Sequence, residues 1–319
     1  MRWTLVTAIA PVAWGTTYFV THEYLPTGHP LYGAAIRALP AGILLLALCR
    51  QVPRGAWWWK SLVLGTLNMG SFFALVYLAA QLLPTSVAST IMAASPLALM
   101  LLAWAVVAER PRGLPLLGGG IGIAGVCLML LTGTVHLNAL GVLTSATAMV
   151  TSSLGYVLAK RWSAEVDVLA STSWQLVAGG LVVLPFAVVR EGAPPSLDTG
   201  AVLAFAYVTV VATAVAFAVW FAGLRRLPAA AVGLVGLLNP VTGVLLGTVV
   251  AKETLTLQQT CGLALVLLGI LLGQPVASAA AARLRTRPRT PGRSRAVGAE
   301  SGRDTRVGRT GRTGRRDAD

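Results

Sequence analysis

The sequence has 319 residues, of which 55% are hydrophobic and 11% charged, and its mean hydropathy is +0.73. An ordinary soluble domain is about 45–50% apolar and about 25% charged, and a soluble surface could not accommodate this excess of apolar side chains. The composition therefore excludes a soluble globular domain and predicts an all-α integral membrane protein.

The net charge of +14 is divided between two regions. Residues 283–319 contain twelve arginines and four acidic residues, whereas the rest of the chain contains thirteen basic and seven acidic residues. Most basic residues of the body are in short loops. The high charge therefore describes a tail and a set of loop anchors rather than a basic binding face.

Apolar blocks of roughly 18–24 residues recur along the chain, each long enough to cross a hydrocarbon layer of about 30 Å. The first block continues to Val20, which favours a spanning helix over a cleaved signal. We predict ten spans, at residues 3–21, 31–50, 61–82, 85–107, 114–132, 137–159, 171–189, 200–222, 229–250 and 257–274.

The loop charges predict the orientation of these spans. With a cytoplasmic N-terminus, ten basic residues before the tail fall inside and only Arg190 and Lys252 fall outside. The positive-inside rule then places both termini in the cytoplasm. Trp57-Trp58-Trp59 is expected at the inner headgroup level, where amphipathic rings are favoured.

The sequence also repeats itself. At an offset of 144 residues five markers coincide, pairing Pro84 with Pro228, Pro96 with Pro240, Glu109 with Glu253, Gly118 with Gly262 and Gly125 with Gly269. At smaller offsets Trp14-Gly15 matches Leu154-Gly155, and Gly42 matches Gly180. Each half, 1–132 and 137–274, holds five predicted spans. Because five is odd, the second half must have the opposite polarity, so we predict an inverted 5+5 repeat, an arrangement typical of transporters.

The same residues carry a family resemblance. Trp14-Gly15, Arg37 and the twin Leu-Pro…Pro…Glu patterns resemble the EamA family of the drug/metabolite transporter superfamily over residues 1–274. The resemblance implies two family units, a ten-helix inverted fold and export of amino acids or other small metabolites across an inner membrane. We expect a secondary transporter working by alternating access, with a channel or a non-transporting scaffold as the alternative.

Two prolines lie inside predicted spans. Pro96 and Pro240 each remove a helical hydrogen bond and displace the carbonyl four residues earlier, those of Met92 and Gly236. Such a kink needs protein or a wet cavity beside it. Either proline alone fits a packing kink, whereas the pair indicates a hinge or cavity lining, with Ser95 and Asn239 as polar neighbours.

Arg37 is the basic residue well inside a predicted span. It could extend to the headgroups, or it could pair with a substrate carboxylate or a helix end. Glu109 and Glu253 end their spans and are expected to be interfacial anchors. Because no acidic residue, lysine or histidine falls at mid-span, we expect a facilitator, an exchanger or weak proton coupling.

Polar and aromatic residues within spans form a candidate substrate-binding set suited to uncharged, zwitterionic or aromatic solutes. Each member alone is equally consistent with helix packing. Together with Arg37, Ser95 and Asn239, the set is Trp14, Thr17, Tyr18, Asn68, Tyr77, Gln81, Tyr156, Trp174, Gln175, Tyr207 and Trp220. Gly118-Gly122 and Gly269-Gly273 have the spacing of close helix contacts.

No motif predicts an enzyme, a metal site or a cofactor. Cys49, Cys127 and Cys261 follow no ligand spacing and are expected to be small core residues. Residues 278–319 are expected to be a disordered cytoplasmic tail, with anionic lipid favoured over nucleic acid as a partner.

Overall fold

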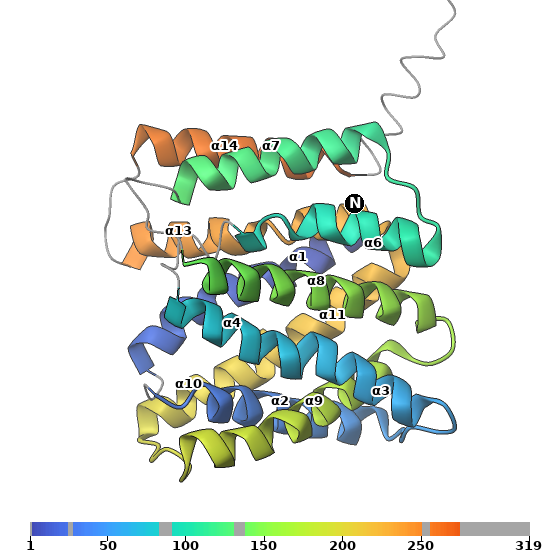
Figure 1. Cartoon of the computed structure of the whole chain (residues 1–319), viewed down its shortest axis with the longest axis vertical. Helices are drawn as coiled ribbons and strands as arrows, with labels where there is room; N and C mark the ends of the chain where they lie inside the picture. Colours follow the sequence, from blue (N-terminus) through green and yellow to red (C-terminus); the bar gives the residue numbers. More distant parts are fainter. Residues whose placement is uncertain (1, 25–27, 83–90, 131–137, 251–255, 275–319) are drawn as a thin grey trace, which may run out of the picture.

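The computed structural model describes residues 2–24, 28–82, 91–130, 138–250 and 256–274. Glu253 and the predicted tail, 278–319, lie outside these residues. Within the described part the chain is all-helical and has no strand. The helices run side by side across Figure 1, so that the connecting loops gather at two ends of the bundle.

The helices of the first half begin with α1 (Arg2–Tyr24) and α2 (Pro30–Cys49). One long segment follows, made of α3 (Trp57–Gly65), the π-helical turn η1 (Thr66–Gly70) and α4 (Ser71–Leu82). The half ends with α6 (Ser95–Val107) and α7 (Gly113–Leu130).

The second half has the same order of elements. It begins with α8 (Ala139–Trp162) and α9 (Val168–Glu191). A second interrupted segment consists of α10 (Thr199–Thr209), the π-helical turn η2 (Val210–Val215) and α11 (Ala216–Arg226). The half ends with α12 (Ala229–Val235), α13 (Leu238–Val250) and α14 (Leu257–Leu272).

Four of the described helical segments are long and apolar enough to cross a membrane. They are Pro30–Cys49, Ala139–Trp162, Val168–Glu191 and Thr199–Arg226, and four shorter apolar helices accompany them. The all-α prediction is confirmed, and each predicted span contains helical residues. That all ten cross the membrane, and that the halves are inverted, stays a prediction.

The two halves pack through pairs of corresponding helices. In Figure 1, α7 lies beside α14 at one edge of the bundle and α2 beside α9 at the opposite edge. Between these edges the contacts come in corresponding pairs. α4 packs on α8, and its counterpart is the contact of α11 with α1. Likewise α6 packs on α8, and its counterpart is the contact of α13 with α1. Exchanging the halves therefore leaves the α7–α14 and α2–α9 contacts unchanged and turns each of the other contacts into its counterpart, which is also present.

Glycines allow the α7–α14 contact. A Cβ atom added to Gly118 would lie 2.5 Å from the carbonyl oxygen of Gly269, and one added to Gly125 would lie 2.6 Å from that of Gly262. Two backbones can approach this closely only where side chains are absent. The predicted role of the Gly118 and Gly269 motifs in helix packing is confirmed.

Three local features differ from expectation. Pro96 does not kink a continuous helix, because a turn at residues 93–94 ends the preceding helical residues and places Pro96 in the first turn of α6, where a missing N–H is tolerated. Trp57 is buried, whereas Trp58 and Trp59 are exposed. Cys261 is exposed rather than a core residue.

Candidate functional site

The two π-helical turns stand at corresponding positions of the halves. η1 begins at Thr66 and η2 at Val210, which are separated by the 144-residue offset of the sequence repeat. A π-helical turn inserts one extra residue into the helix and is frequently found at functional sites. Polar side chains from the other half of the chain form hydrogen bonds with both turns.

η2 receives two side chains from the first half. Arg37 in α2 donates from Nε to Thr213 Oγ1 at 3.0 Å and from Nη2 to the carbonyl oxygen of Ala212 at 3.4 Å. Trp14 in α1 donates from Nε1 to the same Ala212 carbonyl at 3.1 Å. The Arg37 guanidinium also lies 5.0 Å from the centre of the Phe73 ring, within the range of a cation–π contact. Arg37 thus joins three helical segments instead of extending freely to the headgroups.

η1 receives one side chain from the second half. Gln175 in α9 accepts, through Oε1, a hydrogen bond of 2.8 Å from Nδ2 of Asn68. Both residues are almost fully buried, and Asn68 Oδ1 has no partner. Gly155 makes room for this amide, since a Cβ there would lie 2.0 Å from Asn68 Oδ1.

These two contacts correspond to each other in the repeat. Gly42 and Gly180 align at an offset of 138, and the same offset pairs Arg37 with Gln175. The offset of 144 pairs Asn68 with Ala212. The second helix of each half therefore places a polar side chain on the π-helical turn of the other half, with a cation in one contact and a neutral amide in the other.

An aromatic cluster lies beside η2. Trp14 contacts Phe217 and Trp220, with ring centres 5.1 and 5.2 Å apart. Tyr156 contacts Trp220 and Phe221 at 5.6 and 5.9 Å. The predicted residues Trp14, Tyr156 and Trp220 are thereby brought together from α1, α8 and α11.

The break between α12 and α13 borders this cluster. A Cβ added to Gly236 would lie 3.4 Å from the Trp220 ring. The Gly236 carbonyl, expected to lose its partner because of Pro240, accepts from the backbone N–H of Asn239 at 3.1 Å. Asn239 Oδ1 and Trp220 Nε1 are buried without partners. An unpaired donor and an unpaired acceptor are thus both buried near the helix break.

The other predicted residues are distributed as follows. Thr17 bonds to the Ala13 carbonyl of its own helix, Tyr207 bonds to Thr16, and Ser95 begins α6. Trp174 lies apart from the aromatic cluster, because its Nε1 donates to the Gln51 carbonyl in the loop after α2. Tyr18, Tyr77 and Gln81 belong to described helices, but their side chains lie outside the described part.

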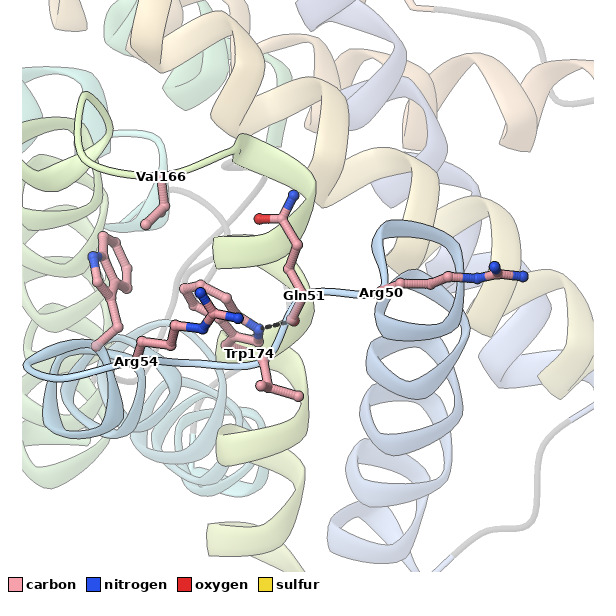
Figure 2. Close-up of a pocket in the computed structure, with 7 residues that line it drawn as sticks. Arg50, Gln51, Arg54, Val166 and Trp174 are labelled. Carbon is pink, nitrogen blue, oxygen red and sulfur yellow. Dashed lines mark hydrogen bonds between the residues drawn. The ribbon is translucent and has the colours of Figure 1, made fainter.

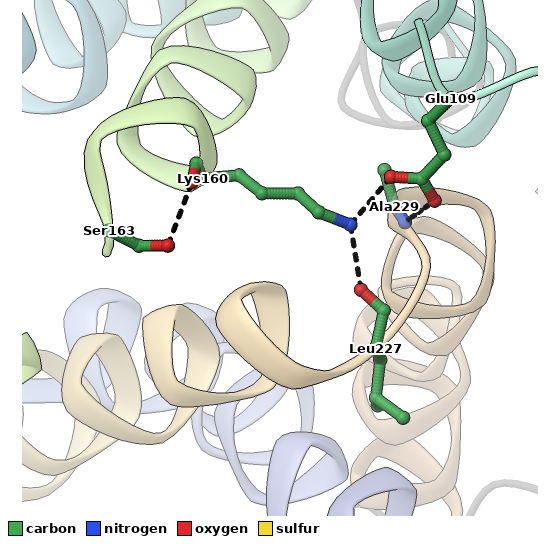
Figure 3. A network of polar contacts seen from close by, with 5 residues as sticks. All are labelled: Glu109, Lys160, Ser163, Leu227 and Ala229. Carbon is green, nitrogen blue, oxygen red and sulfur yellow. Dashed lines mark hydrogen bonds and ion pairs between the residues drawn. The ribbon is translucent and has the colours of Figure 1, made fainter. Parts of the chain in front are cut away.

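Several contacts connect the halves at the end of the bundle that carries the loops 50–56, 108–112, 163–167 and 227–228, which we call the basic end. Glu109 Oε2 lies 2.6 Å from Lys160 Nζ, which also donates to the Leu227 carbonyl at 2.8 Å. Glu109 Oε1 accepts from the backbone N–H of Ala229 at 2.7 Å. Figure 3 shows this network, which ties α6, α8 and the turn before α12 together.

A second ion pair at the basic end joins Lys60 to Glu165. Lys60 Nζ also lies 5.4 and 5.3 Å from the ring centres of Trp57 and Trp162. Both ion pairs cross from one half to the other. Among the described residues no group of three or more histidine, cysteine or acidic side chains is arranged to hold a metal ion.

Lys160, Thr213, Phe217 and Phe221 are not among the predicted site residues. In the sequence Lys160 is one of the ten basic residues of the inner loops, and Thr213 is one of many hydroxyl residues in apolar helices. One signal was present in the sequence. Arg37 and Gln175, both in the candidate set, are separated by the 138-residue offset that aligns Gly42 with Gly180, so they occupy corresponding positions of the repeat.

The comparisons with known proteins agree with this architecture. The model of the EamA-like transporter family matches residues 1–131 and again residues 139–273. A solved crystal structure that is 22% identical superposes with a TM-score of 0.77 and covers 89% of this chain and 99% of its own. The chain therefore shares its fold with that solved structure.

Curated relatives include Protein PecM of Dickeya dadantii, 34% identical over 272 residues, covering 84% of this chain and 90% of that protein. The inner membrane transporter YedA of Escherichia coli K12 is 25% identical over 266 residues, covering 82% and 87%. Taken with the apolar helices, these matches identify a multi-pass membrane protein and a membrane transporter. The chain belongs to the EamA-like transporter family.

Proposed function

We propose that this transporter exports small metabolites, such as amino acids or related solutes, by alternating access of two inverted five-helix halves. The observation that carries the proposal is a pair of corresponding hydrogen bonds between the halves. Arg37 of the first half bonds to η2, and Gln175 of the second half bonds to η1. Contacts at corresponding positions of two related halves fit two units that rock against each other around a shared site, as alternating access requires.

The contacts at the basic end support a conformation in which this end is closed. The Glu109–Lys160 and Lys60–Glu165 pairs both join the halves there. On the orientation predicted from loop charges, this is the cytoplasmic end. A rocking motion would break these pairs and admit solute from the cytoplasm, whereas rejoining them would favour release outside.

The candidate site for the solute lies between η2 and the α12–α13 break. The rings of Trp14, Tyr156 and Trp220 offer apolar faces, and the unpartnered Trp220 Nε1 and Asn239 Oδ1 offer a donor and an acceptor. Arg37 supplies a positive charge close to this cluster through its Ala212 contact. These groups suit a zwitterionic or uncharged solute with an apolar part, and Pro96 and Pro240 are proposed as hinges.

The experiment is a growth-protection screen with toxic amino acids and analogues in cells that overproduce the protein. Expression is expected to lower the intracellular level of at least one compound, and Arg37→Ala and Asn239→Ala are expected to abolish the effect. Thr147→Ala, at an exposed hydroxyl of α8, serves as the matched control and should transport normally. The proposal fails if no compound's level changes, or if the control variant loses transport equally.

A channel is the alternative that the experiment must separate. In reconstituted vesicles a carrier shows saturable flux that is accelerated by solute on the opposite side. Flux that rises linearly with concentration, without counterflow, would favour a channel.

A further inference from the structure

A cavity of about 250 Å³ opens at the basic end, between the loop that follows α2 and the beginning of α9. Its lining includes Arg50, Arg54, Trp57, Val166 and Trp174. Since a water molecule occupies about 30 Å³ of the liquid, the cavity has room for a group much larger than a single ion. It is separate from the aromatic cluster beside η2.

The loop that forms the cavity is held in place. Arg50 caps α2 in the left-handed conformation, with φ of 52°, and donates its N–H to the Leu46 carbonyl at 2.8 Å. Trp174 Nε1 donates to the Gln51 carbonyl at 2.7 Å, and the N–H of Trp57 donates to the Arg54 carbonyl at 3.1 Å. A cavity fixed by such bonds is preorganised, which lowers the entropy cost of binding.

The polar groups of the lining favour an anion. Figure 2 shows Arg54 reaching toward Trp174, whereas Arg50 extends away on the other side of the loop. Trp57 is buried and contributes to the wall of the cavity beside Arg54. No carboxylate belongs to the lining, and the nearby Glu165 and Asp167 are engaged by Lys60 and by the first backbone N–H groups of α9.

We also expect the cavity to lie at the depth of lipid headgroups. Trp58 and Trp59, next to Trp57 in sequence, are 65% and 52% exposed, and exposed tryptophans of membrane proteins favour the interface. Basic pockets at this level of a helical bundle bind anionic headgroups. Arginine suits phosphate particularly well, because its guanidinium donates two parallel hydrogen bonds.

We propose that this cavity binds a phosphate group, held by the Arg54 guanidinium, with Arg50 at its rim and the rings of Trp57 and Trp174 as its walls. The phosphate is that of an anionic lipid headgroup or of a free phosphate ion. Such binding connects the α2–α3 loop of one half with α9 of the other. The proposal concerns a site beyond the transport site and does not depend on the solute exported.

The experiment is native mass spectrometry of the full chain, released from micelles that contain phosphatidylglycerol and phosphatidylcholine in equal amounts. The wild type is expected to retain phosphatidylglycerol preferentially, and Arg54→Gln to reduce this retention about fivefold. Arg54→Lys should lose part of it, because it keeps the charge without the planar fork. Arg190→Gln, at an exposed arginine of the opposite end, and Arg303→Gln in the tail serve as matched controls.

A second measurement distinguishes the two sources of phosphate. Thermal unfolding is followed in phosphatidylcholine alone, with sodium phosphate or with sodium chloride at equal ionic strength. Stabilisation by phosphate that Arg54→Gln removes assigns the site to the free ion, and Arg54-dependent retention of phosphatidylglycerol alone assigns it to the lipid. If neither ligand responds to Arg54→Gln more than to Arg190→Gln, the proposal is wrong.

Discussion

Replacing Lys160 with methionine should open the basic end. The lysine Nζ has two partners, Glu109 Oε2 at 2.6 Å and the Leu227 carbonyl at 2.8 Å. The methionine keeps much of the aliphatic length and leaves Glu109 with its hydrogen bond from the Ala229 N–H. Side-chain exposures of 18% and 27% place the pair between a surface and a buried contact. A hydrogen bond to a charged group contributes about 1.5–3 kcal/mol.

A loss of about 2 kcal/mol would raise the population open at this end about 30-fold. The assay is the rate at which a small maleimide labels Ala230→Cys in a background where Cys49, Cys127 and Cys261 are replaced. Ala230 is buried and borders a cavity of about 500 Å³ that Glu109 also lines. When closing is fast, the labelling rate follows the open population.

Lys60→Met is the matched control, since it removes the other ion pair that joins the halves. Its partner Glu165 is 44% exposed, and exposed pairs contribute about 0–1 kcal/mol. Labelling should therefore rise less than about fivefold in this control. A rate in Lys160→Met that stays within twofold of the wild type, or an equal increase in both variants, would refute the assignment of the Glu109 network as the principal closing contact.

Three further predictions test the interior. Gly118→Val should reduce thermal stability strongly, because its Cβ would lie 2.5 Å from a carbonyl of α14, whereas Gly120→Val faces open space and should unfold like the wild type. Asn68→Ala and Gln175→Ala should each destabilise by about 1–3 kcal/mol, and a double-mutant cycle in denaturation should give non-additive values; additive values would contradict the contact. Arg37→Lys should lose transport although it keeps the charge, because one ammonium cannot reproduce the guanidinium contacts with η2; normal flux would contradict this.

The helices were predictable because their apolar blocks are long and the repeat markers are prolines and glycines, whose backbone roles are specific. The π-helical turns were not predictable, since no residue type of η1 or η2 distinguishes them from ordinary helix. Their correspondence at 144 residues became apparent only when the helical geometry was known.

The candidate site was predictable in part for a related reason. Trp14, Tyr156 and Trp220 meet as expected of a shared lining, whereas Trp174 lies at the basic end because tryptophan suits helix interiors and membrane interfaces equally. Thr213, which accepts a hydrogen bond from Arg37, is 176 residues away. Pairings of this separation depend on how helices pack, which composition and periodicity do not specify.

The central claim is that the two halves have opposite polarity in the membrane. Arg112, before α7, and Thr256, before α14, are separated by the repeat offset of 144 residues. Single cysteines at these positions in the cysteine-free protein are treated with an impermeant maleimide on intact cells. Opposite polarity predicts that Thr256→Cys reacts at once and Arg112→Cys reacts only after the membrane is permeabilised. Reaction of both from the same side would contradict the inverted arrangement and the transport mechanism built on it.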